Sequence, residues 1–145
     1  MTITDYYEDQ SQRKAGGKLQ ASAHIDNRLL FVDDDPTILE GYRFIFEDEG
    51  YAVDVALNQS ELMICLELYD YDAIILDYNL GKSNGVEIAK QINDVTPGVR
   101  IIFISGQKNA EEELISNNIR IDGFFEKPLK AETLLEYISS YLMDQ

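Results

Sequence analysis

From residue 28 onward, hydrophobic and polar positions alternate between two kinds of segment. Short continuous apolar runs such as LLFV at 29–32 and AIIL at 73–76 are typical of buried strands. Longer segments with an apolar residue every three or four positions are typical of helices with one buried side. The expected strands cover 29–32, 51–57, 73–76, 99–104 and 120–125, and the expected helices cover 36–49, 59–69, 85–95, 109–117 and 130–143.

This strict alternation of strand and helix predicts the fold class. Strands that read as continuous apolar runs are buried on both faces, as in parallel sheets covered by helices. We therefore expect an α/β fold with a doubly wound five-stranded parallel sheet. A length of 145 residues suits one domain. We expect a flexible N-terminal tail at 1–26, which is polar and lacks sustained periodicity, and the folded domain at 27–145.

Composition narrows the classes of partner. The chain is 45% hydrophobic, enough for an ordinary core, and its net charge is −15. Such an acidic chain lacks the basic footprint that nucleic acid binding requires. No apolar stretch approaches the roughly 20 residues of a membrane span, and the first residues do not resemble a secretory signal. A single cysteine, Cys65, excludes an internal disulfide. These features predict a cytoplasmic protein that binds neither nucleic acid nor membrane.

Candidate chemistry lies where the expected strands end. In doubly wound sheets, sites form at the carboxyl ends of the strands. Three aspartates follow the first expected strand at 33–35, Asp77 follows the third, Ser105 the fourth and Lys127 the fifth. Carboxylates, a hydroxyl and an ammonium group are thus expected along one edge of the sheet.

The three consecutive aspartates need different explanations. Asp35 precedes Pro36, and this pair is typical of a helix N-cap followed by the first helical residue. Asp33 and Asp34 are then left beside Asp77, where their repulsion requires a cation. Carboxylate oxygens are preferred ligands of Mg²⁺, which takes one or two carboxylates directly and keeps several waters. The pattern therefore predicts a divalent metal site.

In this order, the motifs resemble the receiver domain of two-component response regulators, in particular single-domain receivers like the chemotaxis regulator. The matching pieces are FVDDDP, IILDYNL followed by Gly85, FISG and GFFEKPL, within residues 28 to 143. The resemblance implies a (βα)5 flavodoxin-like fold. It also implies that an aspartate becomes phosphorylated with the help of Mg²⁺, or Mn²⁺ as an alternative.

Roles can be carried over to matching positions. The resemblance makes Asp77 the phosphoacceptor and a metal ligand, Asp34 a direct metal ligand, and Asp33 a ligand through water. It makes the backbone carbonyl of Asn79 a further ligand. It assigns phosphoryl binding to Ser105 and Lys127, and the position of the aromatic switch to Phe124.

The same resemblance implies a function in signalling. The phosphodonor would be a phosphohistidine on a sensor histidine kinase or a histidine phosphotransfer protein, with docking on the first helix and the loop at Pro128. The phosphorylated domain would change its conformation and act on a downstream protein target. A phosphorylation-dependent homodimer is a further form that the resemblance allows. The chain would be a signalling phosphoacceptor that promotes only its own phosphorylation and dephosphorylation, not an enzyme. We expect output through the fourth helix, the fifth strand and the fifth helix, with Glu111, Glu112, Arg120 and Tyr141.

Three positions depart from the family pattern. Gly81 stands where proline is common, Asp122 stands where a small residue is usual, and Phe124 lacks the hydroxyl that other aromatic switches carry. A switch at Phe124 must therefore work through packing.

Two alternatives remain open at this stage. The first is a pseudo-receiver, a binding module with the same fold that acts without phosphorylation. The second is a phosphohydrolase of the haloacid dehalogenase type, because DDDPT fits D-x-D-x-T. In that alternative Asp33 would be the nucleophile and Asp35 the general acid, but Asp77 would have no role.

Overall fold

The computed structural model describes residues 27–143, so the predicted tail, with the only histidine at position 24, lies outside the described residues. Strands and helices alternate along the chain. The larger strands are β1 (Arg28–Val32), β2 (Ala52–Ala56), β3 (Ala73–Asp77), β6 (Ile101–Ser105) and β7 (Gly123–Glu126). The helices are α2 (Pro36–Asp48), α3 (Gln59–Leu68), α4 (Gly85–Val95), α5 (Ala110–Ser116) and α6 (Ala131–Met143).

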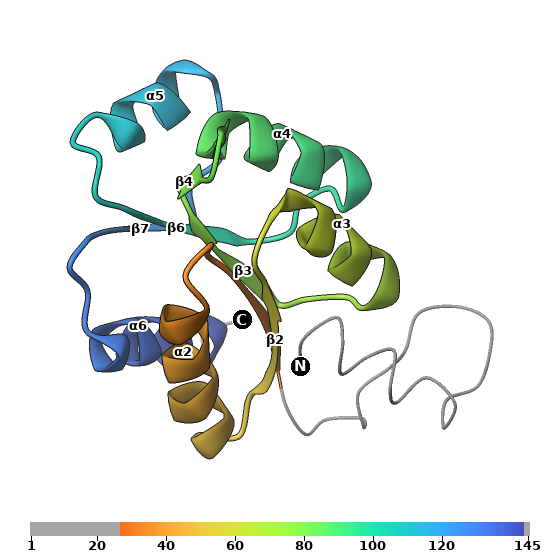
Figure 1. Ribbon diagram of the computed structural model, residues 1–145, viewed down its shortest axis with the longest axis vertical. Helices are drawn as coiled ribbons and strands as arrows, with labels where there is room; N and C mark the ends of the chain where they lie inside the picture. The colour runs from red at the N-terminus through yellow and green to blue at the C-terminus, as the bar shows by residue number, and fades with distance from the viewer. Residues whose placement is uncertain (1–26, 144–145) are drawn as a thin grey trace.

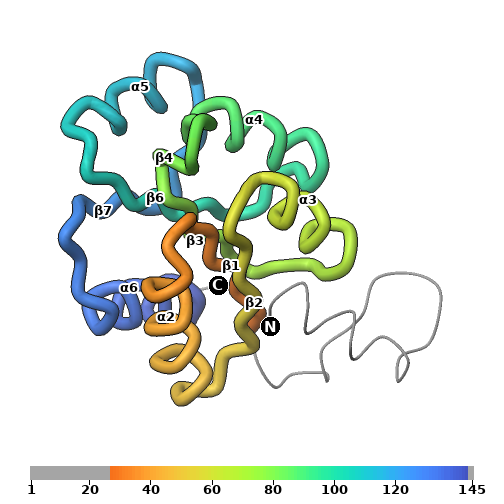
Figure 2. Tube along the Cα trace, viewed as in Figure 1, coloured from red at the N-terminus to blue at the C-terminus, as the bar shows by residue number. Residues whose placement is uncertain are grey.

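The five strands form one parallel sheet in the order β2-β1-β3-β6-β7. Helices α2 and α6 cover one face of this sheet, and α3, α4 and α5 cover the other (Figure 1; the trace in Figure 2 shows the same layers). The strand order reverses direction at β1 and β3, and the carboxyl ends of these two strands are where doubly wound sheets bind ligands. The expected fold class is thus confirmed.

Alternation along each strand divides the core into two halves. On β1, Leu29 and Phe31 join the cluster under α2 and α6, whereas Leu30 and Val32 join the cluster under α3, α4 and α5. All four side chains are buried, as the continuous apolar run requires. Burial on both faces holds the strand ends, and the polar residues that follow them, in a rigid frame.

Short polar side chains start three of the helices. The Asp35 carboxylate accepts a hydrogen bond from the backbone N–H of Thr37 at 2.9 Å, and Pro36 is the first residue of α2. Asn58 and Asn84 cap α3 and α4 in the same way. Each cap satisfies a backbone donor that the first turn of a helix leaves unpaired. The predicted capping role of Asp35 is confirmed.

A small antiparallel hairpin follows the third large strand and was not predicted from the sequence. Strands β4 (Asn79–Leu80) and β5 (Ser83–Asn84) are joined by a two-residue turn in which Gly81 has a φ of 60°. Two-residue hairpin turns favour glycine at positions with positive φ. The glycine at the position where the family often has proline therefore has a structural reason.

Observed boundaries differ from the expected ones by at most two residues, except at the last strand. That strand was expected at 120–125 but begins at Gly123. The Asp122 carboxylate accepts a hydrogen bond from the backbone N–H of Ile101 at 2.9 Å. The Asp122 side chain thus accepts from a backbone N–H that would bond to a strand backbone if β7 were longer. This contact also gives the unusual aspartate a structural role.

One close approach leads to a stability prediction. A Cβ atom added to Gly85 would lie 2.5 Å from Cδ1 of the buried Tyr78 ring, whereas a Cβ added to Gly41 on α2 would meet nothing within 4 Å. Gly85→Ala is expected to lower the free energy of unfolding by about 1–3 kcal/mol because the ring must shift. Gly41→Ala, the control, is expected to raise it by up to about 1 kcal/mol through helix propensity. Urea unfolding measures both, and a Gly85→Ala protein as stable as wild type would contradict the steric argument.

Candidate phosphoacceptor and metal site

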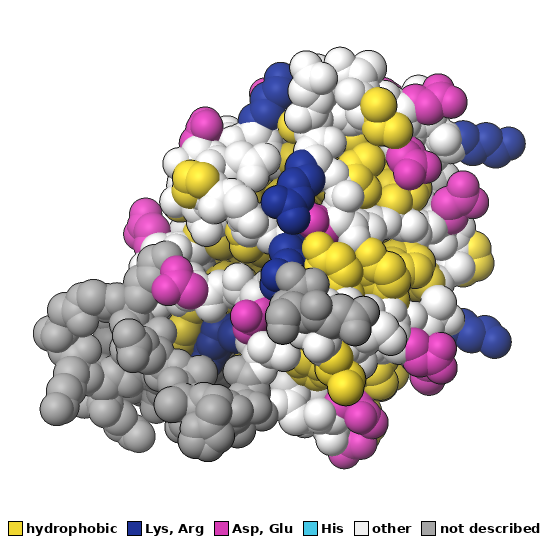
Figure 3. Space-filling model, turned by 180° about the vertical axis from the view of Figure 1, so that it is seen from behind, with side chains coloured by type: hydrophobic (Ala, Val, Ile, Leu, Met, Phe, Trp, Pro, Cys, Tyr) yellow, Lys and Arg dark blue, Asp and Glu magenta, His cyan; other side chains and the backbone are white. Residues whose placement is uncertain are grey.

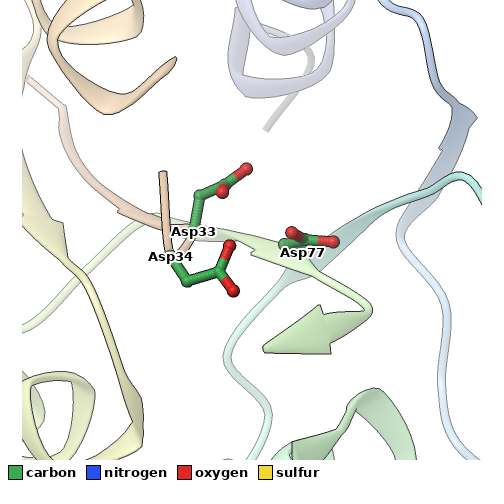
Figure 4. Close-up of side chains that lie close together, drawn as sticks. All are labelled: Asp33, Asp34 and Asp77. Atoms are coloured by element: carbon green, nitrogen blue, oxygen red, sulfur yellow. The ribbon is translucent and has the colours of Figure 1, made fainter. Parts of the chain in front are cut away.

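Three carboxylates converge at the carboxyl ends of β1 and β3. Oxygen atoms of Asp33, Asp34 and Asp77 all lie within 4.8 Å of one another. Asp33 and Asp34 directly follow β1, and Asp77 is the last residue of β3, next to it in the sheet. Figure 4 shows the three side chains around a common space. Asp33 and Asp77 are buried, and Asp34 is exposed, so the cluster opens to solvent on one side.

Lys127 follows the edge strand β7, two strands away from β3 in the sheet, and its side chain reaches this cluster. Its Nζ atom lies 3.1 Å from Oδ2 of Asp77 and 3.6 Å from Oδ2 of Asp33. One ammonium group therefore faces two of the three carboxylates. The set still carries a net negative charge, which favours a further cation.

Backbone donors orient the two buried carboxylates. The Asp35 N–H donates to Oδ1 of Asp33 at 2.9 Å, and the Asn79 N–H donates to Oδ1 of Asp77 at 3.3 Å. In each case the donor comes from two residues further along the chain, where the strand turns into a loop. The turn itself thus holds the carboxylate in place.

The pKa values of three ionisable groups in the site are raised. Burial raises the pKa of the Asp33 carboxyl, and the neighbouring Asp77 carboxylate adds to this effect. Burial also raises the pKa of Asp77, although Lys127 opposes the change. Burial disfavours the ammonium form of Lys127, but its hydrogen bond and attraction to Asp77 prevail and raise its pKa. Burial and mutual repulsion thus make the metal-free carboxylates costly to ionise.

These directions predict how stability depends on pH. A carboxyl whose pKa is higher in the folded protein than in the unfolded chain contributes stability at low pH, and this is lost as pH rises through the folded pKa. In EDTA, Asp33→Asn is therefore expected to be more stable than wild type at pH about 7. The advantage is expected to shrink as the pH falls toward about 3, where the unfolded carboxyl is also largely protonated. Urea unfolding at several pH values measures this, with the exposed Asp94→Asn as control. An advantage that does not change with pH would contradict the argument.

Ser105 and Phe124, two further predicted site residues, lie on β6 and β7, with Ser105 at the carboxyl end and Phe124 two residues before the end of its strand. Ser105 ends β6, one residue beyond Ile104, which pairs with Asp77. Its Oγ atom accepts a hydrogen bond from the backbone N–H of Gln107 at 2.9 Å. Phe124 packs against the core cluster under α3, α4 and α5.

Asn79 begins β4, two residues after Asp77. The structure thus brings the predicted strand-end residues to one edge, but their functional roles remain predictions.

Sequence reasoning missed the contacts of Tyr78 and Glu113. The Tyr78 hydroxyl donates to a carboxylate oxygen of Glu113 at 2.7 Å. Glu113 belongs to the acidic first turn of α5, where glutamates are usually solvated, but its carboxylate is bonded to Tyr78 instead. The only signal was the place of Tyr78 between two predicted site residues, and it did not indicate a partner.

Two tyrosines of α6 make specific contacts instead of lying freely exposed. Tyr137 and Tyr141 stack with ring centroids 5.8 Å apart, and the Tyr141 hydroxyl donates to the Asp122 carboxylate at 3.0 Å. Arg120 forms an ion pair with the same carboxylate at 2.9 Å. Two members of the predicted output surface are therefore tied to Asp122.

An apolar groove of about 640 Å³ opens beside the acidic cluster, between α2 and the segment that follows β7. Its lining residues are Thr37, Ile38, Gly41, Tyr42, Ile45, Lys127, Pro128, Leu129 and Ala131. Lys127 thus borders both the groove and the carboxylates, which places an apolar surface next to the candidate reaction site.

Comparison with known proteins decides the family. The family model that describes the response regulator receiver domain matches residues 29–139 of the sequence. The chain belongs to the response regulator receiver domain family. It is thus a receiver domain of a two-component system, and the predicted resemblance and flavodoxin-like fold are confirmed. The family assignment replaces the dehalogenase-type alternative, in which Asp35, here the cap of α2, would have been a general acid.

Individual relatives agree with this assignment. A CheY-like response regulator receiver domain protein from Methanospirillum hungatei JF-1 shares 30% identity with a TM-score of 0.74, covering 82% of this chain and 95% of that one. The response regulator TrrA from Thermotoga maritima, solved in complex with Mg²⁺-BeF, shares 28% identity with a TM-score of 0.68, covering 79% of this chain and 98% of that one.

Among curated proteins, the alginate biosynthesis transcriptional regulatory protein AlgB of Pseudomonas syringae pv. tomato is 25% identical over 116 residues. The match covers 80% of this chain but only 26% of AlgB. The chain thus spans about a quarter of that relative.

Proposed function

We propose that this receiver, in residues 27–145, accepts a phosphoryl group on Asp77 from a phosphohistidine donor, and that the modification changes its protein contacts. The observation that carries the proposal is the cluster of Asp33, Asp34 and Asp77 with Lys127 within 3.1 Å of the acceptor carboxylate. The donor is a sensor histidine kinase or a histidine phosphotransfer protein. The reaction takes place in the cytoplasm.

The chemistry assigns a role to each side chain. A carboxylate oxygen of Asp77 attacks phosphorus, an O–P bond forms, and the N–P bond to the donor histidine breaks. Lys127 offsets negative charge on the phosphoryl oxygens. After transfer, the Ser105 hydroxyl donates to a phosphoryl oxygen, and Phe124 repacks in the space that Ser105 leaves. Because charge is added beside a packed element, the local event shifts a conformational equilibrium.

The donor set fits Mg²⁺. Hard carboxylate oxygens converge at a solvent-open position, as this ion requires, and a bound cation would offset the repulsion that helps to raise the pKa of Asp33 and Asp77. Asp34, Asp77 and the backbone carbonyl of Asn79 would hold the ion directly, and Asp33 would hold it through water. When bound, the metal would supply positive charge to the transferring phosphoryl group. Mn²⁺ would suit the same oxygen ligands.

The apolar groove beside α2 supports a docking site for the phosphodonor. Ile38, Tyr42 and Leu129 line it next to Lys127. A donor helix seated there would bring its phosphohistidine toward Asp77. Output would pass through protein contacts or a homodimer on the side of α5, β7 and α6.

Surface charge supports protein partners over nucleic acid. On the face shown in Figure 3, acidic side chains are interspersed with basic ones, and hydrophobic side chains gather toward the right of the view. With a net charge of −15, the chain would repel a polyanion. None of the described helices has the length and apolar character to cross a membrane.

Intact mass after incubation with a small phosphodonor tests the proposal. With acetyl phosphate and Mg²⁺, the wild-type protein is expected to gain the mass of one phosphoryl group, and EDTA is expected to prevent the gain. Absence of any gain from either acetyl phosphate or a phosphorylated histidine phosphotransfer protein, with the fold intact, would favour the pseudo-receiver. In that case the domain would bind its partners without phosphorylation.

A further inference from the structure

A chain of hydrogen bonds joins both sides of the candidate site to helix α5. The Tyr78 hydroxyl donates to Oε2 of Glu113 at 2.7 Å, and the Gln107 side-chain amide donates to Oε1 of the same carboxylate at 2.9 Å. Each carboxylate oxygen thus has its own donor. Tyr78 belongs to the segment after β3, Gln107 to the loop after β6, and Glu113 to α5.

The series of hydrogen bonds continues from Gln107 to Ser105. The backbone N–H of Gln107 donates to Ser105 Oγ at 2.9 Å, while the Ser105 carbonyl accepts from the backbone N–H of Lys127 at 2.9 Å. The serine hydroxyl is therefore engaged by its own loop. Gln107, whose side-chain amide also donates to Asn109 Oδ1 at 2.7 Å, links this serine to the carboxylate that holds Tyr78.

Tyr78, at one end of this series of hydrogen bonds, is rigidly held. It lies between Asp77 and Asn79, is 1% exposed, and packs against Gly85, where even a methyl group would not fit. Burial raises the pKa of its hydroxyl, and the hydrogen bond to Glu113 adds to this effect. The hydroxyl therefore keeps its proton and remains a donor to Glu113.

We propose that Glu113 is a positioning residue that holds Tyr78 and the loop between β6 and α5 in the resting arrangement of the receiver. This inference rests on the proposed function, because it concerns the residues that flank the acceptor. To donate its proton to a phosphoryl oxygen, the Ser105 hydroxyl must turn away from the Gln107 carbonyl oxygen, which lies 3.5 Å from Oγ in the resting arrangement. The Glu113 carboxylate resists that step by fixing Gln107 through a second bond.

Two consequences follow from linkage. If Glu113 stabilises the resting arrangement, its removal favours the arrangement that binds a phosphoryl group, and the apparent affinity for a phosphoryl analogue rises. Because Glu113 is part of α5, occupancy of the site and the position of α5 are coupled in both directions. Helix α5 lies at the outer end of the fold beside α4 (Figure 1), so a shift there reaches the surface.

The test measures binding of beryllofluoride, a phosphoryl analogue, in the presence of Mg²⁺ by isothermal titration calorimetry. Glu113→Ala and Tyr78→Phe are each expected to bind it about fivefold or more tightly than wild type. The double variant is expected to gain less than the product of the two single gains, because both changes remove the same hydrogen bond. Glu87→Ala removes the same charge from the first turn of α4 at an exposed position and is expected to match wild type.

The outcomes separate this inference from the function on which it rests. Failure of wild type to bind beryllofluoride or to take up a phosphoryl group would count against the proposed function. Wild-type binding with unchanged or weaker binding by folded Glu113→Ala and Tyr78→Phe would overturn the role of Glu113 alone. Tyr78→Phe keeps the buried ring, so the test stands even if Glu113→Ala does not fold.

Discussion

Asp77→Asn is expected to reduce phosphoryl incorporation from acetyl phosphate and Mg²⁺ by ~10³-fold or more, a loss typical of removing a reacting nucleophile. The change replaces the carboxylate by an amide of the same shape, and an amide is not a nucleophile toward phosphorus. Asp77 ends β3 beside Asp33 and Asp34, and its Oδ2 atom lies 3.1 Å from Lys127. Intact mass over a time course measures the effect.

The control for this prediction is Asp94→Asn, the same chemical change at an exposed position on α4. It is expected to incorporate one phosphoryl group at the wild-type rate. Phosphorylation of Asp77→Asn at a rate near that of wild type would show that the acceptor is another residue. Peptide mapping of the modified protein would then locate it.

Lys127→Met is expected to have two opposite effects. The rate of phosphorylation is expected to fall by about 10²-fold, because a positive group aimed at the developing charge is lost. The affinity for Mg²⁺ is expected to rise, since the ammonium group 3.1 Å from Asp77 and 3.6 Å from Asp33 competes with the metal for these carboxylates. Mass spectrometry measures the first effect and calorimetric Mg²⁺ titration the second.

The opposite directions of these two effects distinguish a specific role of Lys127 from damage to the fold. A misfolded variant would lose both phosphorylation and metal affinity. Lys130→Met, an exposed lysine three residues further along, is expected to behave like wild type in both measurements. A Lys127→Met protein that is phosphorylated at the wild-type rate would show that the lysine only balances charge in the resting site.

Local patterns in the chain were sufficient for the fold and for the candidate site. Continuous apolar strands such as 73–76 require burial on both faces, and the residues after each strand must then meet at one edge of a parallel sheet. Asp33, Asp34, Asp77 and Lys127 were predicted on that basis, and their convergence depends only on strand order. The cap at Asp35 was equally local, because it involves a residue two positions away.

Other features depend on contacts between distant segments, which no local pattern encodes. Glu113 meets Tyr78 across 35 positions, and Asp122 meets Ile101 across 21. In the sequence, the first is an ordinary acidic helix start and the second an unusual residue before a strand. The sequence by itself determined the family, the sheet and the edge that carries the carboxylates. Only the tertiary structure decided that Glu113 joins Tyr78 to the serine loop and that Asp122 shortens β7, because these side chains can use several partners and packing selects one.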